Sequence, residues 1–214
     1  KKKFLEMLMY CTGFRNEQSV VDSITTIHIC EKLAGRLVMT EDMKERLYYG
    51  ALLHDIGMLV IPKEITEAPR KLNSEEIKKV RLHVNAAEKV LGSMLREDVL
   101  SIVLAHHERG DGSGYPKRMR AQQMNKEQKV LQVADTITGM TGKRPYREPL
   151  KKEQIIDGLN EEASLNRMDR QVVNAFITYY DEIMQSVETE SAEVMKMYQM
   201  LNSQYALVSK RFKM

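Results

Sequence analysis

Helical periodicity runs through most of the chain, and this limits the protein to an all-α fold. An apolar stripe over 77–94 recurs at helical spacing, and no alternating pattern of useful length predicts a strand. Thr40 resembles an N-cap, and Asn73 with Glu76 resembles a capping box. Gly57 is well placed to end a helix. We predict a bundle of helices near residues 17–38, 41–55, 73–95, 97–107, 125–141, 151–162, 168–185 and 188–212.

The length of the chain, 214 residues, is enough for one large domain with a sizeable core. We predict this domain over 1–186 and an added C-terminal helix over 187–214. Apolar residues at helical spacing in that helix could pack against the domain or form a homodimer contact. Because the chain begins with Lys rather than Met, an upstream domain such as a sensor could precede it.

The charge balance argues against a DNA or RNA partner. A net charge of +3 is small against 33 basic and 30 acidic residues, and the only basic run is Lys1 to Lys3. No apolar run reaches the ~18 residues that a membrane span needs, and we expect no signal peptide. Two cysteines, Cys11 and Cys30, are too few for a disulfide framework, so we expect a cytoplasmic protein.

Two adjacent pairs, His54-Asp55 and His106-His107, hold three of the five histidines. Such pairs suit neither a surface nor an apolar core, but imidazole nitrogen and carboxylate oxygen together suit Zn, Fe, Mn, Co or Ni. Further candidate ligands, on helix faces next to the predicted core, are Asp22, His83 and Asp135. Helices that deliver ligands to a bundle centre can build a two-metal site, and such a site suits phosphoester hydrolysis.

The single candidates also have simpler interpretations. His83 alone could be a histidine at the edge of the core, and Asp22 could cap or pair locally. An unpaired Asp135 on a core-facing helix would be costly, and a bound metal would remove that cost. His28 lies off the helix face that carries Asp22, so we expect it to be structural.

Four segments carry a family resemblance over about residues 15–185: LLHDIG, RLHVNAAEKVL, HHERGDGSGYP and QVADTITGMTGKRPYR. In this order they resemble the HD-GYP subfamily of HD-domain phosphohydrolases. The resemblance implies an all-α helical bundle, bacterial in origin, with a metal centre in its core. It implies hydrolysis of cyclic di-GMP with two or three metal ions, often iron or manganese. By the same resemblance the metal ligands are His54, Asp55, His83, His106, His107 and Asp135.

We expect Asp55 to bridge two divalent transition-metal ions and to be the catalytic carboxylate. One ion would be completed by His54, Asp22 and Asp135, and the other by His83, His106 and His107. Substrate contacts are predicted at Asp111, Gly114, Tyr115, Pro116, Arg144 and Arg147. The first four could instead form only a tight turn. The two arginines suit phosphate binding but could equally form a solvated basic loop.

Several positions depart from the family pattern. Gln18 and Asp22 stand where the family has Glu and His. Asp22 can still ligate a metal through oxygen, but Gln18 is a weak ligand, which predicts two ions rather than three. Met58 replaces a Lys that contacts the substrate phosphate in the family. Thr138 replaces an Asp that often follows the position of Asp135.

Three hypotheses about function remain open at this point. The first is a metal-dependent phosphodiesterase acting on a cyclic dinucleotide, cyclic di-GMP before others, with reduced activity. The second is a catalytically silent HD-GYP-like signalling module that binds partners. The third is an HD phosphohydrolase that acts on another nucleotide, since Met58 alters phosphate recognition.

Overall fold

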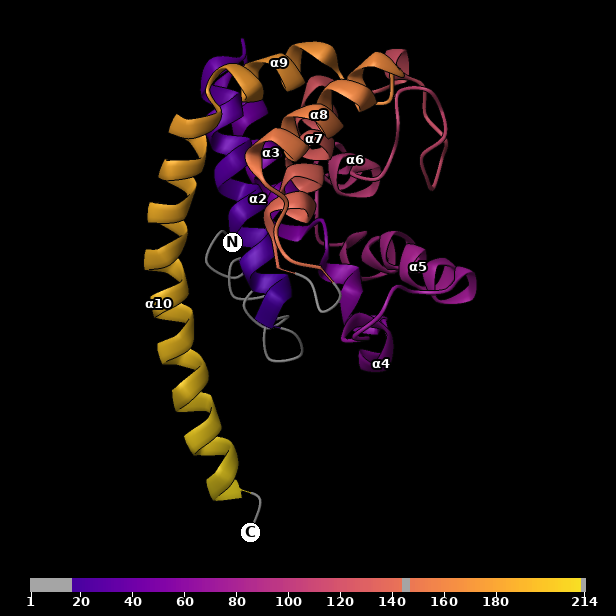
Figure 1. The fold of residues 1–214 in the computed structure, drawn as a ribbon. Helices are drawn as coiled ribbons and strands as arrows, with labels where there is room; N and C mark the ends of the chain where they lie inside the picture. The colour runs from indigo at the N-terminus through magenta and orange to yellow at the C-terminus, as the bar shows by residue number, and fades with distance from the viewer. Residues whose placement is uncertain (1–16, 144–146, 213–214) are drawn as a thin grey trace.

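The computed structural model describes residues 17–143 and 147–212, and every regular element within these ranges is a helix (Figure 1). The predicted all-α class is therefore confirmed. None of the helices in these ranges is both long and apolar enough to cross a membrane. The elements are α2 (Glu17–Arg36), α3 (Glu41–Leu53), η1 (Ile56–Val60), α4 (Lys63–Thr66), α5 (Ser74–Leu91), α6 (Glu97–Ala105), η2 (Ala121–Gln123), α7 (Lys126–Thr141), α8 (Lys152–Ser164), α9 (Arg170–Thr178) and α10 (Tyr180–Phe212).

Polar side chains begin several helices where the sequence predicts them. Thr40 accepts a hydrogen bond from the backbone of Met43 at the start of α3. Asn73 and Glu76 each accept the other's backbone N–H at 2.9 Å, which closes the predicted capping box at the start of α5. These bonds satisfy amides that have no partner within the helix itself.

Helices α2, α3 and α7 form the centre of the bundle. α2 packs against α3, α7 and α10, α3 packs against α6 and α7, and α5 lies against η1 and α6. Fully buried side chains in this core include Leu33, Leu47, Leu131, Ile137 and Phe176. Removal of this apolar surface from water drives the packing. The same packing fixes where the C-terminal ends of α3 and α6 meet.

The predicted boundary between the helices 168–185 and 188–212 is wrong. α9 ends at Thr178, and α10 then runs without a break from Tyr180 to Phe212. The turn at Tyr179 places Phe176 and Ile183 in the same buried core although the chain changes direction between them. No Gly or Pro marks this turn, so tertiary packing decides it.

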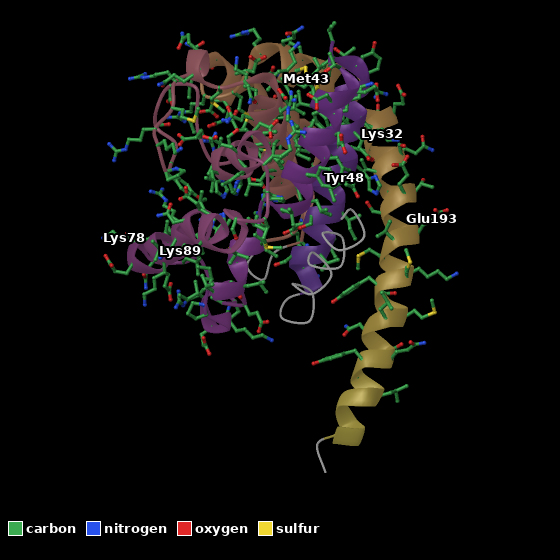
Figure 2. All side chains as sticks on the ribbon, turned by 180° about the vertical axis from the view of Figure 1, so that it is seen from behind. Lys32, Met43, Tyr48, Lys78, Lys89 and Glu193 are labelled. Carbon is green, nitrogen blue, oxygen red and sulfur yellow. The ribbon has the colours of Figure 1, made fainter. Side chains whose placement is uncertain are left out.

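Helix α10 lies along α2 and extends past the other helices (Figure 1). Its first half is tied to α2 by Arg36 with Glu182 and by Lys32 with Glu190, each at 2.5 Å. Figure 2 shows Lys32 beside α10, with Glu193 further along the same helix. Exposed apolar side chains follow in its second half: Met197, Met200, Leu201, Tyr205 and Leu207. The domain limit at 186 and a homodimer contact through this helix stay predictions.

Gly57 allows η1 to lie directly against α5. A Cβ at this position would lie 1.8 Å from the carbonyl oxygen of His83 and 2.8 Å from the amide nitrogen of Ala87. The expectation that Gly57 ends the preceding helix is wrong, because α3 ends at Leu53 with His54 as its C-cap. Two backbones approach closely here, which only glycine permits. This contact brings the segment after α3 next to the helix that carries His83.

We predict that Gly57→Ala destabilises the protein by about 1–3 kcal/mol or more, because the added methyl group must displace the backbone of α5. Urea unfolding followed by circular dichroism measures the change. Gly35→Ala is the matched control, since nothing lies within 4 Å of a Cβ there. It should be neutral or stabilise the helix by up to about 1 kcal/mol. Equal stability of the two variants would contradict the role given to Gly57.

Candidate metal centre

The C-terminal ends of α3 and α6 and the inner faces of α5 and α7 meet at one buried cluster. Neighbouring histidine rings in it have centroids 4.1 to 5.2 Å apart. Three of the four imidazoles are almost completely buried. The cluster brings together six of the seven predicted ligands: His54, Asp55, His83, His106, His107 and Asp135.

Three histidines are oriented by the helices that carry them. The Nδ1 atoms of His54, His83 and His106 lie 2.8, 2.6 and 2.6 Å from the backbone carbonyl oxygen three residues earlier. Because a carbonyl oxygen can only accept, Nδ1 must be the protonated nitrogen in each ring. In the neutral form of each ring, Nε2 then carries the lone pair, which faces the cluster. This is the usual way in which a protein prepares a histidine to bind a metal.

The inward-facing nitrogens lack ordinary partners. His54 Nε2 is buried without a hydrogen-bond partner. His83 Nε2 and His106 Nε2 lie only 3.1 Å apart. Two lone pairs at that distance repel unless a proton or a metal ion lies between or beside them. One atom each from His83, His106 and His107 also falls within 4.8 Å of the others. The donor set therefore fits a transition-metal ion.

Each of the two aspartates lies near His54 and near at least one of the other three histidines. Asp55 Oδ2 is 3.7 Å from His54 Nε2, and its Oδ1 is 3.4 Å from His83 Nε2 and 3.8 Å from His106 Nε2. This geometry suits the bridging role predicted for Asp55. Asp135 also faces both sides, with Oδ1 3.6 Å from His54 Nε2 and Oδ2 3.7 Å from His107 Nδ1. The assignment of Asp135 to the ion of His54 and Asp22 stays a prediction.

The histidines of the cluster differ in pKa because their electrostatic surroundings differ. Burial opposes a charge on His54, but the carboxylates of Asp55 and Asp135 outweigh burial and raise the pKa of His54 to about 9. Burial, reinforced by the neighbouring His54 and His83, lowers the pKa of His106 to about 4. Burial also lowers the pKa of His107 well below its usual value. At neutral pH, His106 and His107 are therefore neutral and able to bind a metal.

A cavity of about 750 Å³ opens onto the cluster. Its wall includes Asp55, His107 and Asp135 from the cluster, together with Asp22 from α2 and Met58 from η1. The cavity is large enough for part of a nucleotide to reach the cluster. Asp22, the seventh predicted ligand, thus lies on the same wall, although its ligation of a metal stays a prediction.

The structure shows where the residues that depart from the family pattern lie. Gln18 lines the cavity, and its Nε2 donates to Asp22 Oδ1 at 2.9 Å, so its amide N–H₂ faces the carboxylate. Met58 is half-buried and offers the cavity a thioether instead of a charge. Thr138 is buried, and its hydroxyl lies 2.8 Å from that of Thr26, which ties α7 to α2. Thr138 therefore has a structural hydrogen bond.

The loop after the His-His pair is held by its own polar residues. Asp111 Oδ1 accepts from the backbone N–H and the hydroxyl of Ser113 at 2.9 and 2.6 Å, and its Oδ2 accepts from Arg167 Nε at 3.1 Å. The hydrogen bonds from Ser113 are the largest cause of a lowered pKa at Asp111. At Gly114 a Cβ would lie 2.3 Å from the amide nitrogen of Arg109, so glycine is required there.

Tyr115 connects this loop to the cluster. Its ring stacks on His107 with centroids 4.8 Å apart and 30° between the planes, and the guanidinium of Arg81 lies over it at 4.9 Å. Its peptide bond to Pro116 is cis, and Pro116 is exposed. The loop can therefore be both a tight turn and a wall of the substrate site. The substrate contacts of Asp111, Gly114, Tyr115 and Pro116 stay predictions.

Sequence reasoning missed three residues that hold this loop. Glu108 is fully buried, and its carboxylate accepts from the backbone N–H groups of Lys117 and Met119 at 2.6 and 2.8 Å. Gln132 Nε2 donates to the carbonyl oxygens of Glu108 and Arg167 at 2.6 and 2.9 Å. Glu108 directly follows the His-His pair, which is a signal that could have found it. Gln132 and Arg167 lie far along the chain and carry no such signal.

Arg147 and His28 are held by partners outside the cluster. Arg144 falls outside the described residues. Arg147 Nη2 donates to the carbonyl oxygen of Gly139, which lines the cavity, and its phosphate contact stays a prediction. His28 is 3.0 Å from Glu190 of α10, so it lies in the α2–α10 contact as expected for a structural histidine.

The chain is a helical bundle that surrounds a buried imidazole–carboxylate cluster with an adjoining cavity. This arrangement is typical of helical proteins that bind metal ions in their core. Residues 9–172 match the family model described as HD domain, so the chain belongs to the HD domain family. Members of this family use metal ions, in agreement with the donor set above.

Curated relatives support the resemblance to HD-GYP proteins. The chain is 30% identical over 165 residues to 3′3′-cGAMP-specific phosphodiesterase 1 of Vibrio cholerae, which covers 77% of this chain and 37% of that protein. It is 28% identical over 192 residues to a cyclic di-GMP phosphodiesterase of Thermotoga maritima, which covers 88% of this chain and 52% of that protein. The chain thus spans about half the length of these relatives or less.

A solved HDG"Y"P protein from Bdellovibrio bacteriovorus has the same fold. The two structures superpose with a TM-score of 0.63 at 19% identity, over 75% of this chain and 51% of that chain. The predicted HD-GYP-like resemblance is confirmed by these findings together.

We predict that the protein binds two divalent ions per chain after anaerobic loading with iron or manganese, since Gln18 is too weak a ligand for a third. Asp55→Ala should lose both ions, because its two oxygens face both groups of histidines. His28→Ala should keep both. Elemental analysis of folded protein measures all three. A value near three ions would contradict the role of Gln18, and unchanged metal content in Asp55→Ala would contradict bridging.

Metal affinity should rise with pH across the neutral range. His54 holds a proton below a pKa of about 9, and an incoming ion must displace that proton. The expected slope is up to about tenfold in affinity per pH unit between about pH 6 and pH 8. Manganese titration by calorimetry at three pH values measures it. A flat profile would show that no proton is displaced from His54.

Proposed function

We propose that this chain is a metal-dependent phosphodiesterase that hydrolyses a cyclic dinucleotide. Cyclic di-GMP is the first candidate substrate and 3′3′-cGAMP the second, since relatives named for each are similar to this chain. The observation that carries the proposal is the buried cluster of four imidazoles and two carboxylates at the wall of a cavity of about 750 Å³. We propose two iron or manganese ions as cofactors, with zinc, cobalt or nickel as alternatives.

The residues of the chain contribute chiefly by position. Backbone carbonyls hold three imidazoles with Nε2 inward, and Asp55 and Asp135 offer oxygens to both groups of histidines. When bound, divalent ions activate water and neutralise charge on a phosphate. The stacked ring of Tyr115 covers one face of His107. Asp55 is the carboxylate that we assign to catalysis.

A silent signalling module is the alternative that one observation favours. Met58 stands on the cavity wall and presents no charge to a phosphate. Such a module would bind the cyclic dinucleotide without turning it over. Hydrolysis assays with separated products distinguish the two: metal-loaded protein is incubated with cyclic di-GMP and 3′3′-cGAMP, and Asp55→Ala serves as the inactive control.

We predict that Met58→Lys raises kcat/KM for the cyclic dinucleotide by about ten- to a hundredfold, which is the worth of one charge-assisted hydrogen bond to phosphate. Val60→Lys is the matched control, because it adds the same charge to η1 at an exposed position outside the cavity. It should leave kcat/KM unchanged. A Met58→Lys protein that holds its metals and binds cyclic di-GMP without hydrolysing it would favour the silent module.

A further inference from the structure

The cavity beside the metal centre has few positive charges for a phosphodiester. Asp22, Asp55 and Asp135 all line it, and Met58 contributes none. The two cationic side chains in its wall, among the described residues, are Arg109 and Lys143. Within the described wall, these two side chains are therefore the candidates for a cationic contact with the phosphates of a substrate.

Arg109 is much the better placed of the two. The side chain of Lys143 is 72% exposed and lies 3.4 Å from Glu148, so it is a solvated surface ion pair. The side chain of Arg109 is 33% exposed and follows His107 by two positions. A long lysine on the surface loses conformational entropy when it binds. A partly buried arginine that is already fixed loses less.

A ladder of ion pairs fixes Arg109. Its Nη1 bonds Glu162 of α8, and the other oxygen of Glu162 accepts from Arg167 Nη1 at 3.2 Å. Arg167 Nε in turn donates to Asp111 Oδ2 at 3.1 Å. The ladder ties the cavity wall to α8 and to the loop that carries Tyr115. It holds the guanidinium in place without a ligand, which is the condition for a pre-organised contact.

Arg109 also keeps donors for a ligand. A guanidinium has five N–H donors, and its one side-chain hydrogen bond in the described part of the chain uses Nη1. Its positive charge reaches the cluster, where it is one of the causes, after burial and the neighbouring histidines, of the lowered pKa of His107. Arg109 and the cluster residues Asp55, His107 and Asp135 line the same cavity, so an anion in the cavity would have both in its wall.

We propose that Arg109 binds a phosphate group of the substrate in this cavity. It supplies the positive charge that Met58 does not, and Glu162 is its positioning residue. The inference rests on the proposed function for the identity of the substrate, but the contact itself requires only a phosphate. Arginine suits this task because its planar fork matches two phosphate oxygens at once.

Inorganic phosphate binding to the manganese-loaded full chain tests the contact without a nucleotide. By titration calorimetry, Arg109→Met should bind phosphate at least about tenfold more weakly than the native chain. Lys71→Met is the matched control, because Lys71 is exposed beside the cavity-lining Leu72 but does not line the cavity itself. It should bind phosphate like the native chain. Equal affinities of Arg109→Met and Lys71→Met would overturn the proposal.

A second variant and a second readout complete the test. Should Arg109→Met lose metal or unfold, Arg109→Gln, which can still hydrogen-bond Glu162, is measured against the same tenfold threshold. With a cyclic dinucleotide, Arg109→Met should raise KM more than it lowers kcat, as expected for a contact present in both ground and transition states. The native chain could fail to hydrolyse either cyclic dinucleotide while Arg109→Met still binds phosphate more weakly than the native chain. In that case the proposed function fails and the Arg109 contact stands.

Discussion

The buried imidazole–carboxylate cluster sets the conditions that the rest of the structure must meet. Several lone pairs converge in a space without water, and His83 Nε2 and His106 Nε2 are only 3.1 Å apart. Such a group is costly to bury unless a cation satisfies it. A proton on His54, stabilised by Asp55 and Asp135, is one answer, and a metal ion is a better one because it can serve several donors at once. We therefore expect metal binding to stabilise the folded protein.

The helices around the cluster act as a rigid frame for it. Each of three histidines is fixed through its own helix backbone, so ring orientation follows from helix position. Helix position depends in turn on close packing, and Gly57 is the clearest example because η1 meets α5 there without room for a methyl group. A small shift of α5 would move His83 relative to Asp55. Precision at the centre thus comes from contacts that are not ligands.

The loop over the cluster is built in a similar way from residues outside it. Glu108 fixes the loop through two backbone amides, and Arg167 fixes it through Asp111. Gln132 joins the two supports. These hydrogen bonds hold the loop with Tyr115 stacked on His107 and with Arg109 in the cavity wall. The electrostatic character of the cavity, acidic near the metal centre and basic at Arg109, is a consequence of that support.

The sequence by itself determined the helical class, most helix starts and six residues of the cluster. Periodicity and capping residues act locally, and the motif spacing reflects side chains that converge on one cluster, so both can be recognised along the chain. Only the tertiary structure decided the break at Tyr179, the close approach at Gly57, the double-sided position of Asp135 and the ladder that holds Arg109. These depend on contacts between residues far apart in the chain, such as Arg109 with Glu162. No local pattern encodes such pairs, because their energies arise only when the helices have packed.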